Sequence, residues 1–369
     1  MTPRALYRQA LERGELQADP AQEALVVKLD ALHQQLVAAQ HTGGARVGLL
    51  SEVLRRFSKP APANFIQGLY IWGSVGRGKT LLVDLFFEAL PFDNKLRMHF
   101  HDFMQFVHAD LKVLGNRSDP LLAVAERLRA RTTVLCFDEF HVSDIADAML
   151  LGRLFEALFD KGTALVTTSN SRPDELYKGG LQRERFLPAI KLIESNTQVV
   201  HLHSATDYRL RALQRESVYH SPVGDAAQAA MSRCYTDLAS DVAECASTIQ
   251  ILGREVSVRA IAHGCAWFDF DVLCRGMRSA SDYVEISKIF HTLLLSKVPI
   301  LNDSDSDATL RFMHLVDTLY DRNVNLVIEA QAQPDELYQG QRLGERFQRT
   351  RSRLEEMQSR DYLARAHLP

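Results

Sequence analysis

The fold of this chain is indicated by Gly73-Ser74-Val75-Gly76-Arg77-Gly78-Lys79-Thr80, a complete G-x-x-x-x-G-K-T stretch. An apolar strand segment, residues 69–72, precedes it, and an apolar helical segment, residues 81–90, follows it. The glycines let successive backbone N–H groups surround phosphate oxygens at the positive end of a helix. Lys79 then reaches the β- and γ-phosphates, and the Thr80 hydroxyl binds Mg²⁺. Because both flanking elements are present, the stretch predicts a nucleoside triphosphate site rather than a glycine-rich surface turn.

The composition describes a globular protein with two domains of ordinary size. The chain has 369 residues, and 46% of them are hydrophobic, which is enough for two buried cores. The formal net charge of −3 provides no general positive field around the molecule. Extensive wrapping by nucleic acid is therefore not expected, and partners must be sought in local features.

The cysteines and the N-terminus favour a reducing, cytoplasmic location. The five cysteines form no C-x-x-C pair, so neither a disulfide framework nor a zinc site is predicted. No apolar run reaches the length of a transmembrane segment. The N-terminus carries Glu12, Glu15 and Asp19 instead of the apolar core of a secretory signal. The cysteines are Cys136, Cys234, Cys245, Cys265 and Cys274.

Residues 1–62 are predicted to form an N-terminal helical segment. Asp19-Pro20 is a favourable helix start, with an acidic N-cap and proline in the first turn. An apolar stripe at helical spacing follows, and we expect it to pack on the chain's own body rather than on a partner. The stripe consists of Leu25, Leu29, Leu32 and Leu36. Lys59-Pro60-Ala61-Pro62 then breaks the pattern and links the segment to the next domain.

Residues 63–210 are predicted to form the nucleotide-binding core. Strand and helix signals alternate here, as in a parallel α/β sheet with ligands at the carboxyl ends of its strands. Residues directly after each strand are therefore candidates for the site. The strands are expected near 69–72, 95–100, 133–138, 163–169 and 197–202.

Residues 211–369 are predicted to form a C-terminal α/β domain. Residues 247–270 resemble antiparallel strands that turn at Leu252-Gly253-Arg254-Glu255. Further on, residues 320–347 repeat residues 159–186 at an offset of 161, with twelve identities in 28 ungapped positions. A second phosphate loop is not found at that offset, because residues 234–241 read CYTDLASD. The domain, residues 280–350 above all, is either a degenerate partial repeat of the core or a case of convergence on one useful turn.

Two acids follow the third predicted strand. Val134-Leu135-Cys136-Phe137 is an apolar run that ends in Asp138 and Glu139. In P-loop enzymes such an aspartate holds the Mg²⁺ shell, and the glutamate polarises the attacking water. We expect Asp138 to serve the cation and Glu139 to be the general base.

Asn170 follows the next predicted strand, where its amide could contact the γ-phosphate or the nucleophilic water as a sensor. Thr167 and Thr168 offer hydroxyls close by. The alternative is that Asn170 only caps the turn before Pro173.

Several arginines are candidates for the neutralisation of transition-state charge. Arg183 and Arg185 lie in a glycine-rich loop, residues 179–186, and one of them is a candidate arginine finger supplied to a neighbouring subunit. The alternative is a pair of solvated surface arginines. Arg349 or Arg353 in the last long helix could act as a second sensor, although the mixed charges there also predict a salt-bridged face.

The histidines of His99-Phe100-His101-Asp102 and His108 do not complete a metal site by their spacing. A structural role or contact with a partner is expected instead. Asn94-Lys95-Leu96-Arg97 fails the guanine-reading pattern Asn-Lys-x-Asp at its last position, which favours ATP over GTP.

With these motifs placed, the chain resembles the ZapE family of AAA+-type ATPases almost from end to end. Its histidine and arginine segments are more diagnostic of the family than the phosphate loop. The matching segments are residues 68–80, His99–Met104, Phe137–Phe140, Asp144–Ala148, Gly180–Ile190, Asp207-Tyr208-Arg209, Phe347–Thr350 and Ser352–Leu354. Trp72 and Ser74 depart from the family pattern without removal of a catalytic group, and residues 210–265 match least.

The resemblance implies an α/β P-loop NTPase fold of the AAA+/ASCE type, ATP and Mg²⁺ as cofactors, and action on the division protein FtsZ, whose polymers become less stable. It also implies a homo-oligomer in the cytoplasm at the division site, close to a membrane surface. The alternatives are a nucleic-acid-linked ATPase of the helicase-loader kind, a nucleotide-gated scaffold and a protein quality-control ATPase. Steep salt-dependent binding to single strands would distinguish the loader.

Overall fold

The computed structural model of the chain divides into two compact units, residues 1–206 and residues 207–369. It describes residues 1–14, 16–42, 66–74, 76–115, 119–142, 144–203, 210, 213, 217–239, 248–262 and 264–368. Val75, the segment 59–62 with its expected domain boundary, and Asp207-Tyr208-Arg209 lie outside these residues. The two units are taken one at a time below.

The first unit contains a five-stranded parallel sheet. Its strands are β1 (Gly68–Trp72), β2 (Lys95–His99), β3 (Val134–Asp138), β4 (Ala164–Ser169) and β5 (Thr197–His201). Every predicted strand of the core is confirmed to within one residue at each end. The strand order is β2-β3-β4-β1-β5, so β4 lies between the strand before the phosphate loop and the strand that ends in Asp138.

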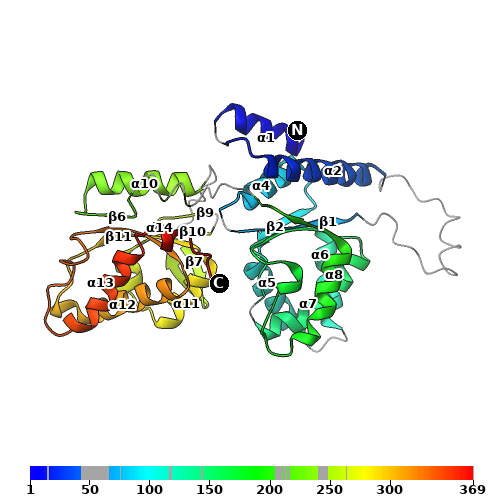
Figure 1. Cartoon of the computed structure of the whole chain (residues 1–369). Coiled ribbons are helices and arrows are strands. Elements are labelled where there is room, and N and C mark those ends of the chain that lie inside the picture. The colour runs from blue at the N-terminus through cyan, green and yellow to red at the C-terminus, as the bar shows by residue number, and fades with distance from the viewer. Residues whose placement is uncertain are drawn as a thin grey trace, which may run out of the picture. The chain divides into compact units, whose positions relative to one another are not determined.

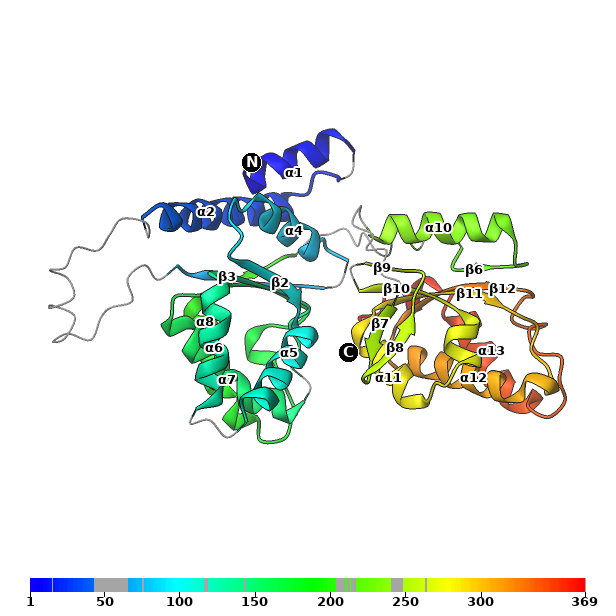
Figure 2. The same cartoon turned by 180° about the vertical axis from the view of Figure 1, so that it is seen from behind.

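Helices cover both faces of this sheet (Figures 1 and 2). One face is covered by α2 (Pro20–Thr42) and α4 (Lys79–Ala89), and α1 (Pro3–Glu12) packs on these two helices. The other is covered by α5 (Phe100–Leu114), α6 (Pro120–Arg131), α7 (Ile145–Asp160) and α8 (Leu187–Asn196). Alternation along β1 separates the two cores, because Leu69 and Ile71 pack with α2 and α4 while Tyr70 packs on the opposite side.

The N-terminal helices begin and pack as their sequence predicts. Asp19 Oδ1 accepts hydrogen bonds from the backbone N–H of Ala21 (2.8 Å) and of Gln22 (3.3 Å), which caps α2. The leucine stripe of α2 is buried against the chain's own body, as expected. The α1–α2 pair therefore shares a core with α4 and one face of the sheet.

The second unit contains a five-stranded sheet of order β6-β12-β11-β10-β9, in which only β9 is antiparallel to its neighbour. Its strands are β6 (Tyr219–His220), β9 (Ala260–Ala262), β10 (Cys265–Asp269), β11 (Thr292–Val298) and β12 (Asn325–Ala330). The predicted hairpin is confirmed as β7 (Thr248–Ile251) and β8 (Arg254–Ser257), joined at Leu252-Gly253.

The helices of the second unit also lie on both faces of its sheet (Figure 2). On β11, Leu294 packs on the side of α10 (Asp225–Ala239), whereas Leu293 and Leu295 face the opposite core. That core is formed with α11 (Ala280–Ile289), α12 (Ser306–Asp321) and α13 (Gly344–Glu356). The short helix α14 (Arg360–Leu363) follows α13. Short helical turns complete the chain: η1 (Pro173–Glu175), η2 (Arg183–Arg185), η3 (Asp271–Arg275) and η4 (Asp303–Asp305).

The two units share an order of elements. The helix–strand pair α7–β4 spans 145–160 and 164–169, and α12–β12 spans 306–321 and 325–330, each at the offset of 161 seen in the sequence repeat. The strand order β2-β3-β4-β1 of the first sheet corresponds to β10-β11-β12-β6 of the second. We therefore propose that the second unit is a degenerate duplicate of the first, with the β7–β8 hairpin and β9 added.

Candidate active site

The phosphate loop connects β1 to α4, and two of its glycines are required by close neighbours. Gly78 has a φ of +83°, and a Cβ placed there would lie 2.7 Å from Gln22 Nε2. A Cβ at Gly73 would lie 2.5 Å from the carbonyl oxygen of Leu202. A side chain at Gly73 would collide with backbone, and one at Gly78 would press on the end of the Gln22 side chain at a φ that favours glycine. Ser74, Gly76, Arg77 and Thr80 follow the same path from strand to helix, and Val75 falls outside the described residues.

Lys79 begins α4, and its ammonium group lies inside the loop. Lys79 Nζ donates to the carbonyl oxygens of Gly73 (2.7 Å) and Ser74 (2.9 Å) and to Asn170 Oδ1 (3.1 Å). The contact with Asn170 brings the residue after β4 to the phosphate loop, because β1 and β4 are neighbours. A cation held in this way suits the binding of phosphate oxygens.

Asp138 ends β3 and is 5% exposed. Its Oδ1 accepts a hydrogen bond from Thr168 Oγ1 (3.4 Å), and its Oδ2 faces an arginine described below. Within the described part of the chain, no group of three or more His, Cys, Asp or Glu side chains could hold a metal ion alone. The donor set fits Mg²⁺ in a nucleotide complex, since Mg²⁺ is bound by one or two protein oxygens together with phosphates and water. Thr80 at the start of α4 offers the second protein oxygen.

Glu139 directly follows β3 with a φ of +54°, a conformation that costs energy for a residue other than glycine. Its backbone N–H donates to Thr168 Oγ1 (3.1 Å), which holds the turn. Burial raises the pKa of the Glu139 carboxyl and nearby Asp138 adds to the rise, while His99 and Lys79 oppose it. A raised pKa favours a carboxylate that accepts a proton from water.

Arg97 and Asp84 were not among the residues expected at the site. Arg97 on β2 donates from Nε (2.9 Å) and Nη2 (2.8 Å) to Asp138 Oδ2. Its Nη1 forms an ion pair with Asp84 on α4, and its Nη2 donates to the carbonyl oxygen of Thr80 (3.4 Å). Burial is the main cause that raises the pKa of Asp84 to about 7, although Arg97 opposes the rise. The sequence signal that could have indicated Arg97 is its position as a charged residue between the apolar Leu96 and Met98 of a predicted strand.

Gln22 is a second residue that the motifs did not reveal. Its side chain is fully buried, and Gln22 Nε2 donates to the carbonyl oxygen of Arg77 in the phosphate loop (3.0 Å). Tyr7 donates its hydroxyl to Gln22 Oε1 (3.4 Å). Helix α2 thus contacts the loop directly, and α1 supports this contact through Tyr7.

The two arginines of the glycine-rich loop differ in their surroundings. Arg183 donates from Nη2 to the carbonyl oxygen of Asp174 (2.5 Å) and is partly buried. Arg185 is exposed at the end of η2. The side chain of Arg185 is therefore the more available of the two for contact with a neighbouring subunit.

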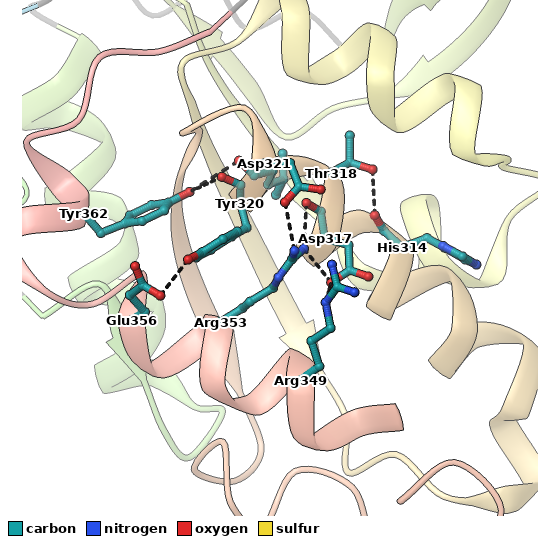
Figure 3. A network of polar contacts seen from close by, with 10 residues as sticks. His314, Asp317, Thr318, Tyr320, Asp321, Arg349, Arg353, Glu356 and Tyr362 are labelled. Atoms are coloured by element: carbon teal, nitrogen blue, oxygen red, sulfur yellow. Dashed lines mark hydrogen bonds and ion pairs between the residues drawn. The ribbon is translucent and has the colours of Figure 1, made fainter. Parts of the chain in front are cut away.

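Two arginines of α13, Arg349 and Arg353, pair with acids of α12, as Figure 3 shows. Arg353 is 12% exposed and pairs with Asp317 (2.7 Å) and Asp321 (2.8 Å), above the ring of Tyr320. Arg349 is 65% exposed, with its Nε 3.8 Å from Asp317. The predicted salt-bridged face is confirmed. The second-sensor role stays a prediction, and Arg349 is the better candidate because its side chain is the more exposed of the two.

The histidines make separate contacts. His99 stands opposite Asp138 in the β2–β3 register and acts electrostatically on Glu139. His101 hydrogen-bonds Gln105 (2.8 Å), and His108 Nε2 lies 2.6 Å from Asp147 Oδ1. None of these contacts assembles the histidines into one cluster.

In the second unit, a carboxylate lies between β12 and the start of α10, the place that corresponds to the phosphate loop under the proposed duplication. Glu329 on β12 is 1% exposed. Its carboxylate accepts from the backbone N–H of Gly224 (3.4 Å), just before α10, and of Lys297 (3.3 Å) on β11. A carboxylate thus lies at the helix end where the first unit presents its loop.

A parallel sheet of order β2-β3-β4-β1-β5, with a G-x-x-x-x-G-K-T loop after β1 and an Asp-Glu pair at the end of β3, defines an α/β P-loop ATPase of the AAA+ type. The profile of the AFG1-like ATPase family matches residues 1–366. The chain belongs to this family, and ATP hydrolysis is its activity.

Two relatives show the extent of the match. The chain is 43% identical over 370 residues to "Cell division protein ZapE" of Escherichia coli K12, covering 100% of this chain and 99% of the relative. It is 36% identical over 352 residues to "Lactation elevated protein 1 homolog B" of Danio rerio, covering 83% of this chain and 69% of the relative.

Solved structures resemble part of the chain. The crystal structure of DnaI matches 44% of this chain and 86% of its own length, at 16% identity and a TM-score of 0.32. Domain III of DnaA from Thermotoga maritima matches 55% of this chain and 72% of its own length, at 17% identity and a TM-score of 0.34. The assignment of the fold rests on the sheet and the loop rather than on these low scores.

Proposed function

We propose that this ATPase is a cell-division factor that acts on FtsZ and lowers the stability of FtsZ polymers in an ATP-dependent way. The observation that carries the proposal is the 43% identity, over the full length of both chains, to the cell division protein ZapE of Escherichia coli. FtsZ as the target comes from the family resemblance of the sequence. The residues of the site support ATP hydrolysis as the energy source, whereas the identity of the target is inferred from the family.

The proposed division of labour follows the contacts of the site. Lys79 and the loop backbone bind the phosphates of ATP, while Thr80 and Asp138 hold Mg²⁺. The cation, when bound, neutralises charge that develops on the phosphate oxygens. Glu139 removes a proton from the attacking water. Asn170, already hydrogen-bonded to Lys79, orients the γ-phosphate or the water.

The proposed setting is a homo-oligomer in the cytoplasm at the division site, near the membrane surface. Among the described residues, no helix combines the length and apolar character needed to span a bilayer.

We expect Arg185 to complete the site of a neighbouring subunit, because its guanidinium is exposed on a short turn. Turnover per chain should then fall on dilution as the oligomer dissociates. Arg185→Ala and Glu139→Gln should each be nearly inactive, whereas their mixture should regain activity. In the mixture, one subunit supplies Glu139 and the other supplies Arg185. Steady-state hydrolysis of the separate and mixed variants measures this complementation.

Arg183→Ala is the matched control, since Arg183 is held by its own chain at Asp174. A mixture that stays inactive, together with turnover per chain that is constant across dilution, would exclude a finger supplied in trans.

The division role is tested by sedimentation of purified FtsZ polymers with this protein, with and without ATP. We expect less FtsZ in the pellet when the wild-type chain and ATP are both present. Lys79→Ala should leave the pellet unchanged because it does not bind ATP, and Glu139→Gln should do so because it does not hydrolyse it.

A pellet that is unaffected by the wild-type chain with ATP would refute FtsZ as the target while the ATPase assignment stands. In that case, binding to a single-stranded oligonucleotide that weakens steeply with salt would favour the helicase-loader alternative.

A further inference from the structure

The guanidinium of Arg97 connects three parts of the candidate site. Arg97 lies on β2, beside Cys136 in the β2–β3 register, and its side chain is 14% exposed. It contacts Asp138 at the end of β3, Asp84 in the middle of α4 and the backbone of Thr80 at the start of α4. A largely buried charged group requires hydrogen-bond partners on several sides. The carboxylates of Asp84 and Asp138 and the carbonyl oxygen of Thr80 are these partners.

The contacts of Arg97 are unequal on the two oxygens of Asp138. Nε and Nη2 both donate to Oδ2, at 2.9 and 2.8 Å. Oδ1 accepts the longer hydrogen bond from Thr168 Oγ1, at 3.4 Å. The planar guanidinium therefore fixes the orientation of the carboxylate through Oδ2. Among the described residues, Oδ1 keeps only the weaker hydrogen bond from Thr168.

Asp84 anchors the arginine from the side opposite Asp138. It lies one turn beyond Thr80 on α4, and its side chain is 19% exposed. The chain Asp84–Arg97–Asp138 joins α4, which carries Thr80 in its first turn, to the strand that ends in Asp138. Both residues assigned to the cation thus contact the same guanidinium, Asp138 through Oδ2 and Thr80 through its backbone carbonyl oxygen.

We propose that Arg97 is a positioning residue for the Mg²⁺ of the nucleotide complex: anchored by Asp84, it holds Asp138 so that Oδ1 faces the coordination shell of the cation. This inference rests on the proposed roles of Thr80 and Asp138. Arg97 itself repels a cation, so its contribution is orientation of the carboxylate. Partners that orient a metal ligand in this way typically change metal affinity by about 10- to 100-fold when they are replaced.

The decisive variant is Arg97→Lys, which keeps the charge but cannot donate two parallel hydrogen bonds from a planar group. The affinity for a fluorescent ATP analogue is measured in EDTA and across a Mg²⁺ titration. We expect the half-saturating Mg²⁺ concentration to rise about tenfold. Affinity in EDTA should stay within about twofold of the wild type, because the loop and Lys79 are intact. Arg129→Lys is the matched control. Arg129 lies on α6 and donates to the carbonyl oxygen of Lys161, so it contacts none of the described residues assigned to the nucleotide or the cation.

Asp84→Asn provides a second test that leaves Arg97 in place. It should shift the Mg²⁺ requirement in the same direction, and it decides the question if Arg97→Lys melts below the assay temperature. Unchanged Mg²⁺ requirements in the folded variants would overturn the proposal. A loss of affinity in EDTA equal to the loss in Mg²⁺ would also overturn it, because it would indicate a purely structural ion pair.

Asp138→Asn separates this inference from the proposed site. If Asp138→Asn raises the Mg²⁺ requirement and Arg97→Lys does not, only the role of Arg97 fails. If Asp138→Asn also leaves the requirement unchanged, the assignment of Asp138 to the cation fails.

Discussion

Replacement of Lys79 with alanine is expected to abolish detectable binding of ATP. The ammonium group lies inside the loop, 2.7 Å from the carbonyl oxygen of Gly73 and 2.9 Å from that of Ser74. Each hydrogen bond from such a group to a charged phosphate contributes about 1.5–3 kcal/mol. Loss of two of them would raise Kd by roughly 100-fold or more, since 1.4 kcal/mol corresponds to a factor of ten. Isothermal titration calorimetry measures both Kd and stoichiometry.

The stoichiometry carries a second expectation. The wild-type chain should bind one ATP and Lys79→Ala none, because Glu329 lies at the corresponding place in the second unit. Lys178→Ala, at a 76% exposed lysine, is the control for loss of a positive charge in the same unit. Residual binding of one nucleotide by Lys79→Ala would show a second site and contradict both expectations.

Glu139→Gln is expected to bind ATP normally but to lower kcat by about 10²- to 10⁴-fold, the usual contribution of a general base. Glutamine has the same shape, so the strained turn at φ +54° and its hydrogen bond from the backbone N–H to Thr168 are retained. What is lost is a basic oxygen, in a place where burial raises the carboxyl pKa and so strengthens its basicity. Single-turnover hydrolysis, with enzyme in excess so that all of the ATP is bound, isolates this step.

Glu126→Gln is the matched control, since Glu126 is an exposed carboxylate of the same unit on α6. Its kcat should equal that of the wild type. If Glu139→Gln hydrolyses ATP at the wild-type rate, Glu139 is not the base and another group must activate the water.

Local patterns in the sequence were sufficient to locate the elements of the nucleotide-binding unit. Its central strands β1, β3 and β4 agree with the apolar runs to within one residue because each of them is buried on both faces. The edge strands β2 and β5 are only partly buried. The leucine stripe of α2 predicted the buried face of that helix, because apolar side chains at helical spacing face a core. The offset of 161 also matched helix to helix and strand to strand between the units.

The site was predicted in its motifs but not in its full set of contacts. Lys79, Asp138 and Asn170 lie at or just after the carboxyl ends of β1, β3 and β4. Their proximity was inferred from the rule that ligands bind at the carboxyl ends of parallel strands. Arg97 and Gln22 belong to no motif. Arg97 meets Asp138 across 41 residues of sequence, and Gln22 meets Arg77 across 55.

The chain's local chemistry therefore determined the class of enzyme, since a glycine loop, a lysine and a strand that ends in two acids require no knowledge of distant neighbours. Tertiary structure alone decided that β4 separates β1 from β3 and that Arg97 is held between Asp84 and Asp138. It also placed Glu329 against Gly224 and Lys297 in the second unit. The physical reason is that these contacts depend on strand order and on side chains from separate elements, about which the periodicity of a single segment carries no information.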